Sequence, residues 1–284
     1  DGKRFFGAGD EGFEKHAGVK VYDAADSRPL NFGNGKPIAD IPDGGDDASN
    51  AVTGLAYADG KLFVAFAARS LISINDAGQG TIEETIQIDK PGPMAVAKDG
   101  SLLVISGGKV FLAKDKKASA FIEQNLDLPA GIAVDGEGKV YVSNGGKLQN
   151  VSVFSPDGKY VKSVGKAGGR PAVGRYEKDG MLEPGGLAID SKGQLWVAET
   201  LDSPKRYSVW NAADGALANE FFGASAYFGW IWMDTKKPDE VYCHSTIWKV
   251  DWQKYSCYPY STIWRATKPN MIRAVAADGY AGHL

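Results

Sequence analysis

The sequence predicts an all-β fold, a six-bladed β-propeller made of four-stranded antiparallel blades. One phrase recurs about every 40 residues, a spacing typical of propeller blades. Within each copy, apolar and polar residues alternate with the period of a strand and not of a helix. The 284 residues include 36 glycines and 13 prolines. Glycine at this level, without a collagen period, indicates many tight turns between short strands.

The recurring phrase is a small residue or proline, an apolar run, an Asp/Gly turn, and a second run of apolar and aromatic residues. Its copies begin at Gly54, Pro93, Gly131, Gly186 and, in degenerate form, Trp230. Each phrase supplies the first two strands of a blade, and a second pair of strands follows it. The pair is clearest in residues 151–164, where Pro-Asp-Gly forms a hairpin turn.

These repeats set the blade boundaries within one predicted domain, residues 1–284. The blades are predicted at residues 51–89, 90–127, 128–165, 182–223 and 228–266, with residues 166–181 as an insertion. The chain ends supply a composite sixth blade from residues 1–44 and 270–284. Its outer strands are expected at residues 3–6, 18–22 and 37–41, and its first strand at residues 271–277. A ring closed in this way has no exposed sheet edges.

The blade sequence resembles the NHL-repeat family of six-bladed propellers. Residues 129–165 carry the closest match, with Pro-Ala-Gly-Ile-Ala-Val-Asp, a glycine turn, Val-Tyr-Val-Ser-Asn, and then Val-Ser-Val-Phe before Pro-Asp-Gly. Residues 184–223 match well, residues 53–127 less well, and residues 228–266 in outline. The resemblance implies the fold. It does not select a function, because the family holds protein-binding domains, lyases and uncharacterised modules.

The charge balance argues against two classes of partner. The chain has 32 Lys and Arg against 35 Asp and Glu, a net charge of -3. Without a cationic field, binding to nucleic acid or to an anionic membrane surface has little electrostatic support. No apolar stretch approaches the roughly 18 to 20 residues that span a bilayer. The chain opens Asp1-Gly2-Lys3, and we expect a secreted or periplasmic protein whose partners could include neighbouring domains of a longer chain.

A ligand site is predicted on the face that carries the longest loops. By resemblance to the family, loops between second and third strands and between blades share this face. They lie in residues 8–17, 144–150, 166–181 and 199–206. Residues expected to contact a small ligand or protein partner are Arg170, Arg175, Tyr176, Glu199, Asp202, Arg206 and Asn144.

Two interpretations of the insertion stay open. Bare backbone at Gly168-Gly169 beside Arg170 and Arg175 could receive a carboxylate or another oxyanion. Alternatively, Arg170 and Arg175 pair with acidic residues and pin a long loop. The acidic partners considered are Glu177, Glu199 and Asp202.

The leading hypothesis is a binding or scaffold module that is not evidently catalytic, and the alternative is a metal-dependent hydrolase or lyase. Glu14, His16, His244 and Glu199 could hold a divalent ion, Ca²⁺ or Zn²⁺, at the mouth of the channel, and such an ion could activate water. No cofactor is certain from the sequence.

A second, more distant resemblance bears on this alternative. The gluconolactonase and paraoxonase-like propellers bind a metal partly through the asparagine of Pro-Asn-Gly-Leu-Ala. The corresponding positions here are Ala130 and Gly185, which cannot ligate through a side chain, while Asn144 and Glu199 remain as potential ligands.

Aromatic residues and cysteines gather near the C-terminus. The five tryptophans there are Trp230, Trp232, Trp248, Trp252 and Trp264. We expect most of them to fill the core between blades, with a platform for sugars or a protein as the alternative. Cys243 and Cys257 are predicted on a second and a fourth strand, about 9 to 10 Å apart. That separation is too long for a disulfide, so both are expected to be free, buried thiols.

Overall fold

The computed structural model describes residues 2–8, 18–35, 51–200, 204–223, 231–233, 236–243 and 246–262. These residues form an all-β structure in which the only helical turn described is the 3-10 turn Ala67–Arg69. The contacts divide the chain into two compact units, residues 1–142 with 152–162, and residues 143–151 with 163–284. Among the described residues, no helix is long and apolar enough to cross a membrane. A single domain over residues 1–284 stays a prediction.

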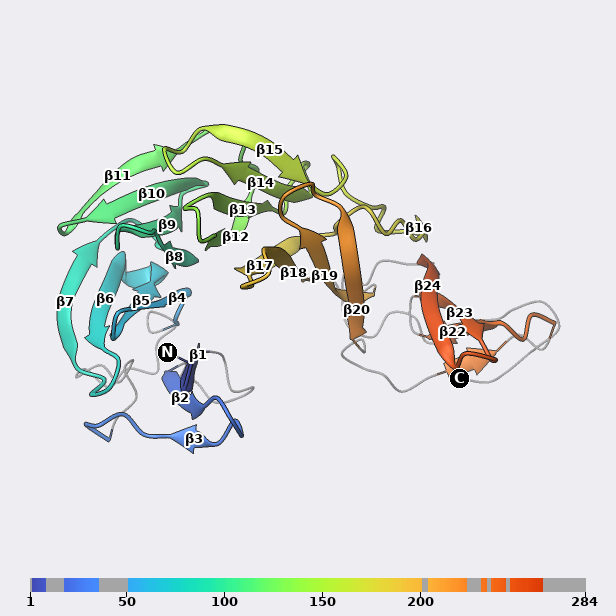
Figure 1. Ribbon diagram of the computed structural model, residues 1–284, viewed down its shortest axis with the longest axis horizontal. Helices are drawn as coiled ribbons and strands as arrows, with labels where there is room; N and C mark the ends of the chain where they lie inside the picture. The colour runs from blue at the N-terminus through green and yellow to red at the C-terminus, as the bar shows by residue number, and fades with distance from the viewer. Residues whose placement is uncertain are drawn as a thin grey trace. The chain divides into compact units, whose positions relative to one another are not determined.

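Three antiparallel sheets lie wholly in the first unit (Figure 1). The first sheet comprises β1 (Arg4–Ala8), β2 (Val19–Asp23) and β3 (Pro29–Leu30). The second comprises β4 (Gly54–Ala58), β5 (Lys61–Phe66), β6 (Leu71–Asp76) and β7 (Ile82–Gln87). The third comprises β8 (Met94–Val96), β9 (Leu102–Ser106), β10 (Lys109–Lys114) and β11 (Lys117–Ile122). In each sheet, consecutive strands are hydrogen-bonded neighbours, as expected for meanders joined by short turns.

A fourth sheet contains residues of both units, and two more lie in the second unit. The fourth comprises β12 (Pro129–Val134), β13 (Val140–Asn144), β14 (Asn150–Phe154) and β15 (Tyr160–Val164). The fifth comprises β17 (Pro184–Ile189), β18 (Gln194–Glu199), β19 (Lys205–Asn211) and β20 (Leu217–Gly223). The sixth comprises β21 (Ile231–Met233), β22 (Glu240–Cys243), β23 (Thr246–Asp251) and β24 (Ser256–Thr262), with β16 (Gly174–Arg175) added beside β24.

The prediction of antiparallel sheets is confirmed, and four consecutive antiparallel strands lie within each of the five ranges that the repeats predict between residues 51 and 266. The N-terminal sheet contains a strand that the sequence analysis did not predict, Pro29–Leu30, which pairs with β2. Residues 37–41 and 270–284 lie outside the described residues, so the composite blade remains a prediction. The insertion, residues 166–181, also contains a short β-strand. Its residues Gly174 and Arg175 pair with Thr262 and Ser261 as a fifth strand of the last sheet.

The core of the first unit explains why the phrase at Gly54 begins with a glycine. Ile72 and Leu102, on different sheets, belong to one buried cluster and are at most 1% exposed. Between these sheets the backbones approach closely, since a Cβ on Gly54 would lie 2.1 Å from the carbonyl oxygen of Gly92. Only glycine allows that approach.

An aspartate at the end of the first strand orders the following turn in two sheets. In the β12–β13 turn, Asp135 Oδ1 accepts hydrogen bonds from the N–H groups of Glu137 and Lys139, both at 2.9 Å, and its Oδ2 accepts one from the Tyr141 hydroxyl at 3.0 Å. Asp190 repeats the arrangement six residues before Trp196, whose indole N–H donates to Asp190 Oδ2 at 3.0 Å. The Asp/Gly turn is therefore also a hydrogen-bonded clamp on the second strand.

The Asp190 clamp predicts an acid-dependent loss of stability. Hydrogen bonds from the Gln194 N–H and the Trp196 indole lower the pKa of Asp190 in the folded protein. The native protein should therefore have a larger free energy of unfolding than an Asp190→Asn variant at pH values above about 4, the ordinary aspartate pKa. This advantage should shrink as the pH falls from there through the lower native pKa. Urea unfolding between pH 3 and pH 7 measures it.

The control for this prediction is Asp59→Asn, in the β4–β5 turn, because the structure describes no hydrogen bond to the Asp59 side chain. If the two variants respond to pH alike, the clamp does not cause the effect.

Candidate functional site

Strand alternation in the second unit places two opposite charges on one buried sheet face. Along β18, Leu195, Val197 and Glu199 are buried and point to the same side. Along β19, Arg206 and Ser208 are buried on that face as well. The alternation that sets the packing of these strands therefore brings a carboxylate and a guanidinium together.

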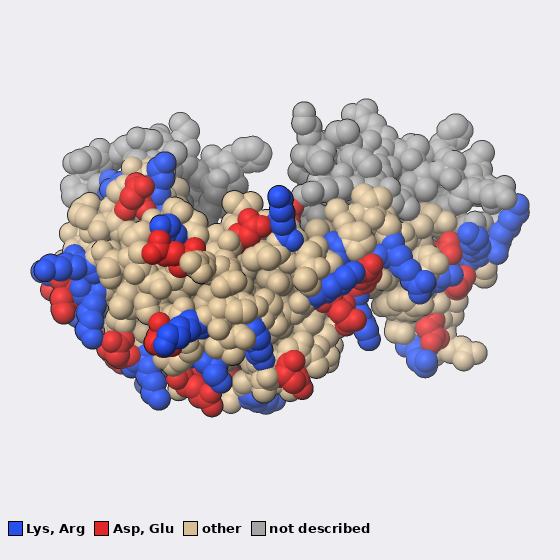
Figure 2. All heavy atoms as spheres, turned by 90° about the horizontal axis from the view of Figure 1, so that it is seen from above, with Lys and Arg blue, Asp and Glu red and all other residues tan. Residues whose placement is uncertain are grey.

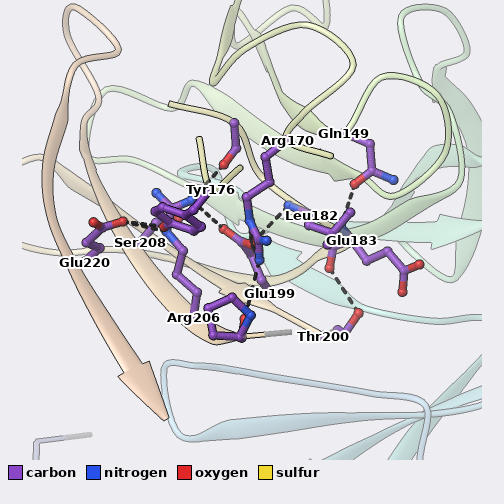
Figure 3. A network of polar contacts seen from close by, with 12 residues as sticks. Gln149, Arg170, Tyr176, Leu182, Glu183, Glu199, Thr200, Arg206, Ser208 and Glu220 are labelled. Atoms are coloured by element: carbon purple, nitrogen blue, oxygen red, sulfur yellow. Dashed lines mark hydrogen bonds and ion pairs between the residues drawn. The ribbon is translucent and has the colours of Figure 1, made fainter. Parts of the chain in front are cut away.

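Glu199 is the centre of a buried ion cluster that includes the insertion (Figure 3). Its Oε2 lies 3.0 Å from Nη2 of Arg170, and its Oε1 lies 3.2 Å from Nη1 of Arg206. The N–H of Leu182 donates to Oε2 at 3.0 Å. Arg206 Nε in turn lies 3.1 Å from Oε2 of Glu220, on β20. The side chains of Arg170, Glu199 and Arg206 are at most 1% exposed.

The two guanidinium groups also hold backbone carbonyls. Arg206 donates to the carbonyl oxygens of Gly180 at 2.7 Å and Lys178 at 2.6 Å, both in the insertion. Arg170 donates to the carbonyl of Pro204 at 3.4 Å. One sheet face thus fixes the path of the insertion through charge-assisted hydrogen bonds.

Tyr176 closes the cluster on the insertion side. Its ring centroid lies 5.3 Å from Cζ of Arg170 and 5.7 Å from Cζ of Arg206, within the range of cation–π attraction. Its hydroxyl donates to Glu220 Oε2 at 2.6 Å. Burial, together with that hydrogen bond, raises the pKa of Tyr176. The phenol therefore stays protonated and acts as a donor.

The cluster is balanced in charge and has a structural role. Burial raises the pKa of Glu199, whereas the charges of Arg170 and Arg206 and the hydrogen bonds act in the opposite direction. Two positive and two negative side chains compensate one another. For Arg170, the pairing with Glu199 that pins a long loop is therefore the arrangement observed.

The predicted oxyanion site at Gly168-Gly169 is wrong. The N–H of Gly168 donates to the carbonyl of Leu148 at 3.0 Å, and that of Gly169 to the carbonyl of Lys166 at 2.9 Å. A Cβ on Gly169 would lie 2.2 Å from the Met181 carbonyl oxygen. These amides are thus used in folding the insertion, and no bare backbone is left to receive an anion.

Asn144 lies at the end of β13. It is fully buried, and its amide donates to Asn150 Oδ1 at 3.4 Å. Gln149, in the following loop, accepts a hydrogen bond from the N–H of Glu183, just after the insertion, at 2.5 Å and donates to the carbonyl of Gly146 at 2.9 Å. The sequence analysis missed Gln149 and Glu220. Alternation along β20 is a signal for Glu220, but no local signal exists for Gln149.

Arg175 differs from the other two arginines because it is exposed. Its Cζ lies 5.9 Å from the ring centroid of Tyr260, on the neighbouring strand β24. The pairing of β16 with β24 is reinforced by the Ser261 hydroxyl, which donates to the Gly174 carbonyl at 3.0 Å, and by the Tyr176 N–H, which donates to the Tyr260 carbonyl at 2.9 Å. Of the acidic partners considered for Arg175, Glu177 pairs with Lys166 and Glu199 with Arg170 and Arg206, while Asp202 lies outside the described residues.

Most of the predicted metal ligands lie outside the described residues. These are Glu14, His16 and His244, and the predicted ligand-binding residue Asp202 lies outside them too. Glu199 is described, and both of its oxygens face guanidinium groups. Within the described part of the chain, no group of three or more His, Cys, Asp or Glu side chains could hold a metal ion. A site built on the histidines stays a prediction.

The C-terminal aromatic residues are more exposed than predicted. Trp252 lies in the turn after β23 and is 52% exposed, although its indole N–H donates to the Pro238 carbonyl at 2.7 Å. Trp248 is half-buried, against Phe222. Tyr255, Tyr258 and Tyr260 are also exposed. The other three tryptophan side chains lie outside the description. Trp252 is therefore not a core residue, and the expectation that most of the five tryptophans lie in the core stays a prediction.

The two cysteines occupy the predicted strands. They are free and lie on β22 and β24, with β23 between them. Cys243 is buried, but Cys257 is exposed, so the expectation of two buried thiols is wrong for Cys257.

One of the comparisons with known proteins supports the type of fold. No protein-family model matches the chain, and no curated protein matches it by sequence. A chain of the crystal structure of a nidogen/laminin complex is similar, with 14% identity, a TM-score of 0.55, and coverage of 90% of this chain and 92% of that one. A chain of Kuenenia stuttgartiensis hydrazine synthase has 15% identity and a TM-score of 0.48; the match covers 71% of this chain and 57% of that one. Both structures contain β-propellers, and the first likeness supports a propeller-like fold.

Proposed function

We propose that this chain is a propeller-type binding module that recognises a protein partner with its insertion, residues 166–181. The observation that carries the proposal is the buried ion cluster, which holds the insertion in one conformation. Transferring charged groups from water into a protein interior is costly, and such clusters contribute less to stability than to a unique arrangement. A long ordered loop is more often functional than a short turn.

The outward side of the insertion has the character of a contact surface. Exposure alternates along residues 171–175, where Pro171, Val173 and Arg175 are exposed while Ala172 and Gly174 are half-buried. Val173 is 51% exposed. A surface whose conformation is already fixed loses less entropy on binding than a flexible loop does. The nidogen/laminin structure is itself a complex of two proteins, and this is consistent with a protein partner for the shared fold.

We also propose the finer architecture, six blades in a closed ring of NHL type. It is supported by four sheets of four strands and one of five, and by an N-terminal sheet in which the described residues form three strands, β1 to β3. Residues 271–277 would supply the first strand of this blade.

Site-directed photocrosslinking tests the binding function. A benzophenone amino acid at Val173 should crosslink one protein reproducibly in cells of the source organism. Excess unlabelled protein should suppress this crosslink. The matched control is Val161, a valine of β15 with 52% exposure. If both positions give the same weak products, or if competition has no effect, the insertion is not a recognition surface.

A further inference from the structure

We propose that Arg175 recognises a carboxylate of an acidic segment in the protein partner. This inference rests on the proposed function and assigns a chemistry to the same surface. The segment would carry apolar side chains next to its acidic residues.

The charge of Arg175 has no carboxylate partner among the described residues, unlike those of its cationic neighbours. Arg170 and Arg206 are neutralised by glutamates. Lys249, whose Nζ lies 5.3 Å from the centroid of the same Tyr260 ring, is bound to Asp239 at 2.7 Å and to Glu240 at 3.0 Å. Arg175, unlike Arg170 and Arg206, is therefore a described cation of the insertion whose charge is not used within the described structure.

The Tyr260 ring lies next to the Arg175 guanidinium, with Cζ 5.9 Å from the ring centroid, within the range of cation–π attraction. A guanidinium over an aromatic ring keeps its N–H edges free, and these edges match the two oxygens of a carboxylate. The backbone beneath is fixed, because Gly174 and Arg175 pair with β24 and Tyr176 is anchored in the buried cluster. A side chain held in this way loses little conformational freedom when it binds.

The surroundings of Arg175 favour a protein segment over nucleic acid. Val173, Tyr258 and Tyr260 are exposed by 51%, 58% and 37%, so the patch offers apolar and aromatic area around one cation. The acidic groups nearby are already paired: Glu177 with Lys166, and Glu220 with Arg206. Over the face shown in Figure 2, basic and acidic residues are interspersed, without the continuous basic area that a phosphate backbone requires.

Fluorescence anisotropy with a labelled peptide of alternating glutamate and valine tests the inference. The full chain should bind this peptide, and Arg175→Gln should weaken binding at least tenfold while leaving the melting temperature unchanged. Replacing the glutamates of the peptide by glutamine should have the same effect. The control is Arg69→Gln, which removes the same charge from an arginine stacked on Phe66 at 5.7 Å and should change binding less than twofold.

Three outcomes would overturn the inference: equal binding by Arg175→Gln and the parent protein, equal binding of the glutamine peptide, or equal losses in the two arginine variants. Competition by millimolar glutarate or inorganic phosphate as strong as that by unlabelled peptide would indicate a small-anion site instead of a protein segment. Crosslinking from Val173 separates the two proposals. A specific crosslink with no effect of Arg175→Gln leaves the binding function intact and removes only the role of Arg175.

Discussion

Substitution of Glu199 by alanine should lower the free energy of unfolding by about 3 to 5 kcal/mol, the usual cost of removing one partner of a buried ion pair. The reason is that Arg170 and Arg206 would remain buried without the carboxylate that separates their charges. The N–H of Leu182 would lose its acceptor too. Urea unfolding monitored by tryptophan fluorescence measures the change, and Trp210, which is 2% exposed on the neighbouring strand, reports on this region.

The matched control is Glu177→Ala, which removes a glutamate from the same insertion. Glu177 pairs with Lys166 at the surface, where its side chain is 42% exposed. A solvated pair of this kind contributes about 0 to 1 kcal/mol. If the two variants lose equal free energy of unfolding, burial does not determine how much the Glu199 cluster contributes to stability.

The sheets could be predicted from the sequence because their signals are local. Strand alternation and turn chemistry are each contained within about ten residues. The turn glycines Gly60, Gly100 and Gly158, for example, have φ angles of 77°, 81° and 79°, the left-handed conformation that the Asp-Gly turns predict. The third strand of the first sheet is the exception, since Pro29–Leu30 is only two residues long and carries no alternation.

The site could be predicted only in part, because its contacts are between residues far apart in the chain. Arg170 and Glu199 are 29 residues apart, and their pairing was one of two open interpretations. The bond between Ser261 and Gly174 spans 87 residues, and no pattern near either residue indicates it. A two-residue strand added to a distant sheet depends on the path of the whole insertion. Local sequence patterns therefore could not show that Arg175 is exposed next to Tyr260 whereas Arg170 is buried.

The four glycines of the insertion illustrate this limit. The repeat does not require Gly165, Gly168, Gly169 or Gly174, and a role in a ligand site was one interpretation of them. All four have positive φ angles, from 69° to 115°. Their abundance is explained by the backbone path of the insertion, and Gly169 is the position at which this path leaves least room.

Gly169→Ala should therefore lower the free energy of unfolding by about 2 to 4 kcal/mol. Two costs add up: alanine is strained in a left-handed backbone conformation, and its Cβ overpacks the site. The new Cβ would lie 2.2 Å from the Met181 carbonyl oxygen and 2.5 Å from the Gln149 Cβ, at a φ of 69°.

Two glycines of the same unit separate these causes. Gly168 has a φ of 76° but its nearest atom at 4.0 Å, so Gly168→Ala should cost about 1 to 2 kcal/mol. Gly186 has neither constraint and should tolerate alanine within about 0.5 kcal/mol. Urea unfolding of the three variants should give this order. A loss at Gly168 as large as that at Gly169 would show that conformation alone, and not the close crossing beside Arg170, holds the insertion in place.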